Sequence, residues 1–161
     1  MIAAAKEQNN SSTWKWVKPR SLHLTLHFLD EQNEEKIKNI IQISERVAEN
    51  FSPSDVTVGE WGAFPNFSQP RIFFISLKDS DTLIRLHDEL ARELEQSGFK
   101  IDKRPWQTHV TVARNKSPRP KKLILPEIKK GLDWKMQSFE LMKSNLLADG
   151  AEYEIVKSFK L

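Results

Sequence analysis

Apolar and polar residues alternate along residues 22–29, and this period of two predicts a β-strand. One face of that strand would carry apolar side chains, namely Leu22, Leu24, Leu26 and Phe28. The opposite face would carry His23, Thr25 and His27. Further strands are predicted at residues 55–60, 71–77, 108–114, about 138–147 and about 152–160. The last two would form a hairpin around Asp149-Gly150, which is a turn signal.

Apolar residues spaced three and four positions apart predict an amphipathic helix over residues 34–50 and another over residues 81–97. Gly98 follows the second helix, where a C-cap glycine belongs. Residues 62–66, Gly-Ala-Phe-Pro-Asn, are interpreted as a loop. A long basic loop is expected to follow the 108–114 strand.

The predicted elements come in an order that repeats. A strand containing His-x-Thr is followed by a helix and further strands, and a second helix then precedes a second His-x-Thr strand. No long linker separates the halves of the 161-residue chain. We therefore expect an α+β fold of two similar lobes, each a small sheet that carries a helix on its outer side.

Composition limits the classes of function. Apolar residues make up 39% of the chain and charged residues 29%, which is typical of a globular protein. The absence of cysteine excludes disulfides and thiolate metal sites, and it fits a reducing compartment. No segment approaches the roughly 18 to 20 apolar residues of a membrane helix, so a cytoplasmic protein without membrane attachment is expected. The net charge of +3 suits a polyanionic ligand without deciding the matter.

Two tetrads carry the candidate chemistry: His23-Leu24-Thr25-Leu26 and His109-Val110-Thr111-Val112. Side chains two apart on a strand share a face, so each tetrad presents an imidazole beside a hydroxyl. Imidazole titrates near neutrality, and two imidazoles can serve as a general acid and a general base. The hydroxyls can donate to phosphate oxygens where charge develops. This chemistry requires no metal and no cofactor.

The repetition of the tetrad decides between two interpretations. A single tetrad could equally be a strand histidine on a solvated face beside a threonine that favours β-structure. The first residues of the two tetrads are 109 − 23 = 86 positions apart, and the chain has only four histidines, so a chance pairing is much less favoured. His27 is expected to be a solvated residue further along the strand, and His87 a boundary residue of the second helix.

At these residues the chain resembles the two-histidine phosphoesterases, specifically the RNA 2′,3′-cyclic phosphodiesterases, also described as 2′-5′ RNA ligase-like proteins. The resemblance covers about residues 14–161. Four blocks carry it: residues 16–29 from Trp-Val-Lys-Pro through the first tetrad, residues 62–72, residues 109–114, and residues 146–153.

The resemblance implies one bilobal domain over residues 1–161, with two small antiparallel sheets facing a central cleft and helices outside. Since a phosphate group spans only a few ångströms, we expect the two imidazoles to lie about 5 to 8 Å apart across the cleft. It also implies hydrolysis of a cyclic phosphate at an RNA end to a 2′-phosphate, and the reverse ligation. We assign the base to His109 and the acid to His23. Family members open with a strand and a full helix, whereas here Ile2 to Lys6 looks like only the tail of that helix.

The resemblance further suggests that Arg114 contacts phosphate. Strict alternation would place Arg114 on the face opposite His109, so only a bulge or the strand's end could bring it to the site. A plain surface arginine is the competing interpretation. A group of basic residues after the second tetrad has two open interpretations. They could bind the phosphates of an RNA backbone or be solvated surface charges: Lys116, Arg119, Lys121, Lys122, Lys129 and Lys130. Base stacking or core packing are both open for Trp106, Phe64 and Phe67.

Two alternatives to the leading hypothesis stay open. The enzyme could act on small cyclic nucleotides or on 2′-5′ linked oligonucleotides, for which binding would depend weakly on salt. A non-catalytic module that binds RNA ends would need the basic and aromatic residues but no pair of titrating histidines. Turnover of a 2′,3′-cyclic nucleotide with a chelator present separates the enzyme from the binding module.

Overall fold

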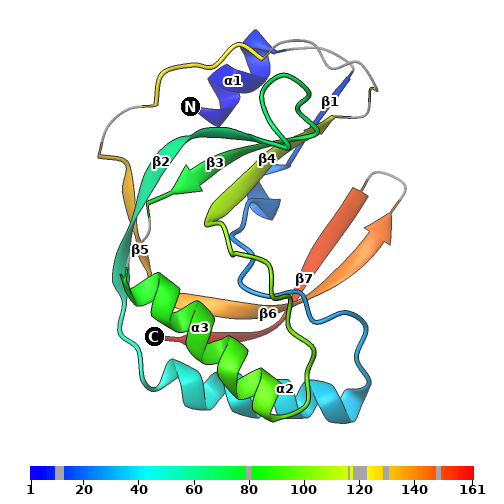
Figure 1. Ribbon diagram of the computed structural model, residues 1–161, viewed down its shortest axis with the longest axis vertical. Helices are drawn as coiled ribbons and strands as arrows, with labels where there is room; N and C mark the ends of the chain where they lie inside the picture. Colours follow the sequence, from blue (N-terminus) through cyan, green and yellow to red (C-terminus); the bar gives the residue numbers. More distant parts are fainter. Residues whose placement is uncertain (10–12, 79–80, 116, 118–122, 129–130, 148–149) are drawn as a thin grey trace. The chain divides into compact units, whose positions relative to one another are not determined.

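The computed structural model describes residues 1–9, 13–78, 81–115, 117, 123–128, 131–147 and 150–161 (Figure 1). The described part of the chain forms two compact units. The first unit consists of Met1–Thr25, Thr57–Lys78 and Trp106–Asp133, and the second of Leu26–Val56, Asp79–Pro105 and Trp134–Leu161. The predicted α+β class is confirmed, because helices and antiparallel strands occur in both units.

A five-stranded sheet has the strand order β1-β4-β3-β2-β5, and its pairs β1–β4, β4–β3 and β3–β2 are antiparallel. Most of the sheet belongs to the first unit, whereas residues 54–56 of β2 and residues 134–136 of β5 belong to the second. These strands are β1 (Trp14–Trp16), β2 (Ser54–Phe64), β3 (Ile72–Leu77), β4 (His109–Asn115) and β5 (Asp133–Met136). One face of the sheet is covered by a core of Phe73, Ile75, Val112 and Ala113, joined by Ala5 from the helix α1 (Ile2–Gln8). The indole of Trp61 stacks on Phe73 with 4.8 Å between ring centroids. This apolar packing leaves the other face of the sheet for polar groups.

The second unit packs two amphipathic helices with a two-stranded hairpin. The helices are α2 (Glu34–Ala48) and α3 (Asp81–Gln96), and the strands are β6 (Ser138–Leu147) and β7 (Gly150–Lys160). Ile43 and Leu86 are fully buried in the shared core, which also includes Phe139 and Phe159 from the hairpin. No helix in the described ranges is both long and apolar enough to span a bilayer.

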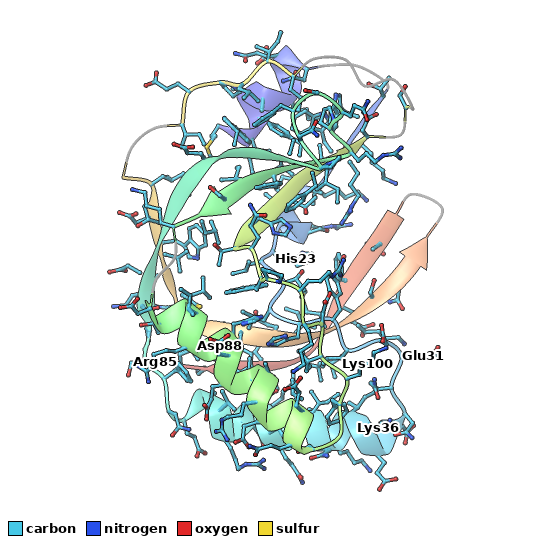
Figure 2. The ribbon with its side chains drawn as sticks, viewed as in Figure 1. His23, Glu31, Lys36, Arg85, Asp88 and Lys100 are labelled. Atoms are coloured by element: carbon cyan, nitrogen blue, oxygen red, sulfur yellow. The ribbon has the colours of Figure 1, made fainter. Side chains whose placement is uncertain are left out.

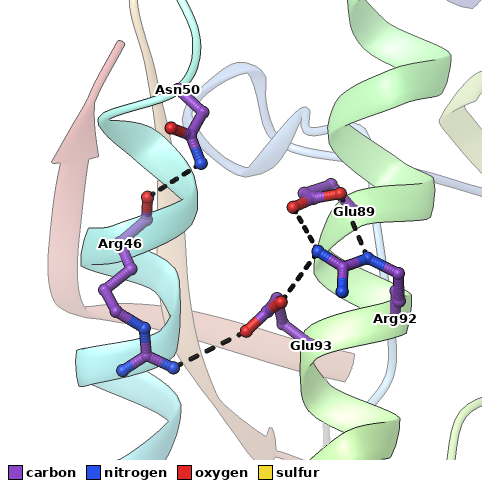
Figure 3. Close-up of polar contacts among 5 residues, drawn as sticks. All are labelled: Arg46, Asn50, Glu89, Arg92 and Glu93. Atoms are coloured by element: carbon purple, nitrogen blue, oxygen red, sulfur yellow. Dashed lines mark hydrogen bonds and ion pairs between the residues drawn. The ribbon is translucent and has the colours of Figure 1, made fainter.

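Polar contacts between the two helices lie at the edge of this core (Figure 3). Arg92 forms ion pairs with Glu89 at 2.6 Å and with Glu93 at 2.8 Å, and Arg46 of α2 reaches Glu93 at 3.7 Å. Exposed ion pairs of this kind contribute little to stability. The buried apolar stripes therefore hold the helices together, and the ion pairs add specificity at the rim.

The helix predictions are confirmed to within two residues. Asn33 caps α2 because its side chain accepts a hydrogen bond from the backbone N–H of Lys36 at 2.9 Å. Gly98 lies just beyond α3 with a φ of +83°, a conformation that glycine adopts without strain. The predicted hairpin is also confirmed by the pairing of β6 with β7, although Asp149 lies outside the described residues.

Three strand predictions need correction. Residues 62–64 belong to β2, not to a loop, because they pair with β3 from Gly62↔Phe74 to Phe64↔Ile72. The short strands β1 and β5 were not predicted. Residues 22–29 do not form a strand: they make one isolated bridge, Leu24↔Val110, after which the chain leaves the first unit at Leu26. Because the pairing is antiparallel and β4 begins at His109, the residues after Thr25 have no residue of β4 opposite them, although the alternating pattern continues.

His27 is partly buried in the second unit, not solvated as predicted. Its Nε2 lies 2.8 Å from the carbonyl oxygen of His87 and therefore donates a hydrogen bond to it. The two imidazoles stack with 4.3 Å between centroids. Burial lowers the pKa of His27, His87 lowers it further by charge repulsion, and the hydrogen bond and the carboxylates of Asp88 and Glu95 oppose that shift.

The lowered pKa predicts a specific loss of stability in mild acid. The unfolded chain takes up a proton at His27 near pH 6.5, whereas the folded chain resists protonation until the pH is lower. The free energy of unfolding should therefore fall as the pH drops below about 6.5. His27→Gln keeps a donor for the His87 carbonyl but does not titrate, so its stability should decline less. Urea unfolding of both proteins between about pH 7.5 and about pH 5 measures the difference, and equal declines would contradict the prediction.

Candidate active site

The histidine and threonine residues of both tetrads lie in the first unit, at the β1 edge of β4. Leu24 forms an antiparallel bridge with Val110. In an antiparallel pair the neighbours of a bridged pair also lie opposite each other, so His23 faces Thr111 and Thr25 faces His109. His23 is labelled in Figure 2. Because Val112, two residues from Val110, is buried in the core, all four polar side chains lie on the opposite face, which we call the site face.

The bridge sets the spacing of the two histidines. His23 lies opposite Thr111, and His109 is two residues away from Thr111 on the same face of β4. Such diagonal neighbours are roughly 7–8 Å apart, and their Cβ atoms are somewhat closer. Each imidazole thus has a threonine directly opposite and the other imidazole on the diagonal. The two imidazoles and the two hydroxyls thus alternate around a square on the site face.

Each of the two imidazole rings is oriented by a hydrogen bond to the backbone carbonyl two residues before it. The Nδ1 of His23 lies 2.8 Å from the carbonyl oxygen of Ser21, and the Nδ1 of His109 lies 2.7 Å from that of Gln107. A carbonyl oxygen only accepts, so Nδ1 carries the hydrogen in each ring. Nε2 is therefore the nitrogen through which each ring can exchange a proton with a ligand.

An aromatic pair supports His109 from the neighbouring strands. Phe64 stacks on Phe74 with 4.4 Å between centroids, and the two rings lie 5.2 Å and 5.1 Å from the centroid of His109. Phe74 is only 4% exposed. The position of its ring depends on Gly62 of β2, where an added Cβ would lie 2.2 Å from two ring carbons. The imidazole of His109 thus packs against these two rings, and its Nδ1 contacts the backbone carbonyl of Gln107.

Trp106, three residues before the second tetrad, contacts the backbone of the first tetrad. Its indole Nε1 donates a hydrogen bond of 3.1 Å to the carbonyl oxygen of Thr25. The ring is partly buried, and this contact connects the residues before β4 with the residues after Leu24. Trp106 and Phe64 thus have structural contacts within the unit, whereas the side chain of Phe67 is 48% exposed.

A bulge in β4 places Arg114 on the site face. Phe74 pairs with Thr111 and Phe73 with Ala113, so Val112 is an extra residue in β4. Val112 and Ala113 both enter the core, and the alternation resumes one residue later. Arg114, opposite Ile72, therefore lies on the same face as His109. The sequence analysis required a bulge or the strand's end for this placement. The sequence itself carries no signal for where the bulge lies.

Lys15 is a site-face residue that was not predicted from the sequence. It is the middle residue of β1, and its neighbours Trp14 and Trp16 both pack against the core. Lys15 itself pairs with Arg114 across the strands and so lies on the opposite face. The signal in the sequence was the Trp-x-Trp pattern, which predicts a polar residue on the exposed side of a short strand.

The basic residues that were expected near the site have no structural test. The basic residues Lys116, Arg119, Lys121, Lys122, Lys129 and Lys130 lie outside the described residues. Among the described residues, no group of three or more His, Asp or Glu side chains is arranged to hold a metal ion.

Comparison with known proteins connects this geometry to a family. The family model of the 2′-5′ RNA ligase superfamily matches residues 2–146. The RNA 2′,3′-cyclic phosphodiesterase of Archaeoglobus fulgidus is 33% identical over 159 residues, covering 96% of this chain and 88% of that protein. The protein of the same name from Thermus thermophilus is 32% identical over 154 residues, covering 92% of this chain and 76% of that protein.

Solved structures agree with the fold. The crystal structure of the Thermus thermophilus protein TT0787 superposes with a TM-score of 0.88 at 30% identity and covers 99% of this chain and 88% of that one. The apo structure of E. coli LigT superposes with a TM-score of 0.82 at 21% identity, covering 99% of this chain and 87% of that one.

The contact between Gly62 and Phe74 predicts that Gly62→Ala displaces the ring that supports His109. The new methyl group would overlap Phe74 in a closely packed position, so the free energy of unfolding should fall by about 1–3 kcal/mol. The imidazole resonances of His109 in an NMR spectrum should shift, because its aromatic neighbours move. The resonances of His27 and His87 in the second unit serve as internal controls and should stay in place. Unchanged His109 resonances would contradict the supporting role of Phe74.

Proposed function

Because the chain belongs to the 2′-5′ RNA ligase superfamily, we propose that it hydrolyses the 2′,3′-cyclic phosphate at an RNA end to a 2′-phosphate, with His23 and His109 as the acid–base pair. The observation that carries the proposal is the square of two imidazoles and two hydroxyls set by the Leu24↔Val110 bridge. The relatives named RNA 2′,3′-cyclic phosphodiesterase support the choice of substrate.

The diagonal placement of the histidines suits an in-line displacement at phosphorus. His109 takes a proton from water through Nε2, and the water oxygen attacks phosphorus. The bond from phosphorus to the ribose 3′ oxygen breaks, and His23 gives its proton to that oxygen. The attacking and leaving oxygens lie on opposite sides of phosphorus, as do the two imidazoles across the square. The reverse reaction would join a 2′,3′-cyclic end to a 5′-hydroxyl end.

Thr25 and Thr111 occupy the other two corners of the square. Their hydroxyls would donate to the non-bridging phosphate oxygens, on which negative charge increases in the transition state. Arg114 on the site face would add a positive charge for a phosphate of the substrate. The residues of the chain supply the proton transfers and the charge stabilisation, so the proposed reaction needs no metal ion or cofactor. The absence of cysteine suits a cytoplasmic location.

The proposal predicts turnover without added metal. Purified protein should convert a nucleoside 2′,3′-cyclic phosphate into the 2′-phosphate in the presence of EDTA at an unchanged rate, because imidazoles carry the proton transfers. Product analysis by chromatography against 2′- and 3′-phosphate standards identifies the bond that breaks. A rate that falls with EDTA and returns with one divalent ion would show that the chemistry is misassigned. Binding of RNA ends without turnover would support the binding-module alternative.

Single substitutions test the acid–base pair. His23→Ala and His109→Ala should each lower kcat by on the order of 10² to 10⁴, the usual contribution of a positioned acid or base. The double variant should be little slower than the slower single variant, since the two groups act as a unit. Thr25→Ala and Thr111→Ala should cost about 10- to 1000-fold. His27→Gln, which lies in the second unit, is the matched control and should keep full activity. Near-full hydrolysis by His23→Ala would refute the mechanism.

A further inference from the structure

Two cations face each other next to the catalytic square. Lys15 of β1 lies directly opposite Arg114 of β4 in the antiparallel register, and both lie on the site face. Lys15 is half-buried and Arg114 is exposed. The flanking residues Trp14 and Trp16 pack against the core, which fixes the direction in which Lys15 leaves the strand.

This arrangement is unfavourable for the empty protein. Like charges directly opposite each other on one face of a sheet repel. Ion pairs elsewhere in the described part of the chain connect lysines and arginines with carboxylates, but none of them involves Lys15 or Arg114. The pair therefore presents a concentrated positive charge, and binding of an anion between the two side chains would relieve the repulsion.

The position of the pair indicates which anion it fits. Arg114 is three residues from Thr111, roughly 10 Å along an extended strand at about 3.3 Å per residue, and less across the bulge at Val112. Lys15 lies on the same edge of β4 as His23, separated from it by the turn at Pro19–Ser21. The pair is thus about one nucleoside away from the phosphate that reacts at the square.

We propose that Lys15, together with Arg114, binds the phosphate on the 5′ oxygen of the terminal nucleoside, the one whose 2′,3′-cyclic phosphate is hydrolysed. This phosphate is present where the substrate is an RNA end and absent from a nucleoside 2′,3′-cyclic phosphate. Lys15 is therefore a specificity-determining residue that favours RNA ends over small cyclic nucleotides. The inference rests on the proposed function of the catalytic square and assigns to the site a second phosphate position.

A pair of substrates that differ in one phosphate tests the inference. Adenosine 2′,3′-cyclic phosphate is compared with the same nucleotide carrying a 5′-phosphate, and a dinucleotide ending in a 2′,3′-cyclic phosphate is the third substrate. Wild-type protein should show a kcat/KM about 3- to 10-fold higher for the two substrates with a 5′ phosphate, the contribution of a partly exposed charge-assisted contact. The preference should weaken as salt increases.

Substitutions at Lys15 should change this preference. Lys15→Gln should bring the three kcat/KM values together by lowering only those for the substrates with a 5′ phosphate, and Lys15→Arg should keep the preference. The slope of log kcat/KM against log salt for the dinucleotide should fall in magnitude by about 0.7, the value for one phosphate contact on a single strand. Lys36→Gln on α2 is the matched control and should behave as wild type.

The possible failures are distinguishable. If wild-type protein hydrolyses none of the three substrates, the proposed function fails. If it hydrolyses them all without preference, or if Lys15→Gln slows all three equally, the inference about Lys15 fails while the proposed function stands. A preference confined to the dinucleotide and absent with the single 5′-phosphate would also overturn the inference, because the contact would then lie with the next base or sugar.

Discussion

The pairing of β4 on both of its edges determines where every polar group of the site lies. On one edge β3 sets the register through Phe74↔Thr111 and Ser76↔His109. On the other edge the chain pairs twice, first through β1 and then through Leu24, with the turn at Pro19–Ser21 projecting between them. A slip of one residue on either edge would exchange the site face for the core face. The apolar residues of β4, above all the buried Val112 and Ala113, prevent such a slip because they must remain in the core.

The bulge in β4 reconciles two demands on one short strand. The strand must bury two consecutive residues against the tryptophans of β1, and it must also direct both Thr111 and Arg114 to the same face. Regular alternation cannot do both. The extra residue meets both requirements, at the cost of irregular pairing with β3. The second irregularity of the sheet, in β2 between Val58 and Trp61, brings Ser76 into hydrogen bonds with the backbone of Glu60.

The sequence predicted the helices and the family better than it predicted the strand edges. The apolar stripes around Ile43 and Leu86 are long and periodic, so many residues together indicate each helix and no single residue decides it. The His-x-Thr tetrads were found because they repeat, and the family resemblance drawn from them is confirmed by the family model. Roles of individual site residues remain proposals.

The features that sequence could not supply depend on tertiary pairing. Residues 22–29 alternate like a strand, but only Leu24 finds a partner, because the length of β4 and not the local pattern limits the pairing. β1 has three residues, too few for periodicity to be recognised. The partial burial of His27 required the stacked His87, which lies 60 residues away in sequence. In each case a contact distant in sequence overrides the local preference.

The separation of the bridged residues has a consequence for how the protein is made. Leu24 and Val110 are 110 − 24 = 86 residues apart, so the bridge closes a loop that contains both α2 and α3 of the second unit. During synthesis the first histidine leaves the ribosome long before the strand that holds its counterpart. The nascent chain can fold helix α2 while it has no complete site. The two His-x-Thr tetrads therefore come together only after β4 has been synthesised and has joined the sheet.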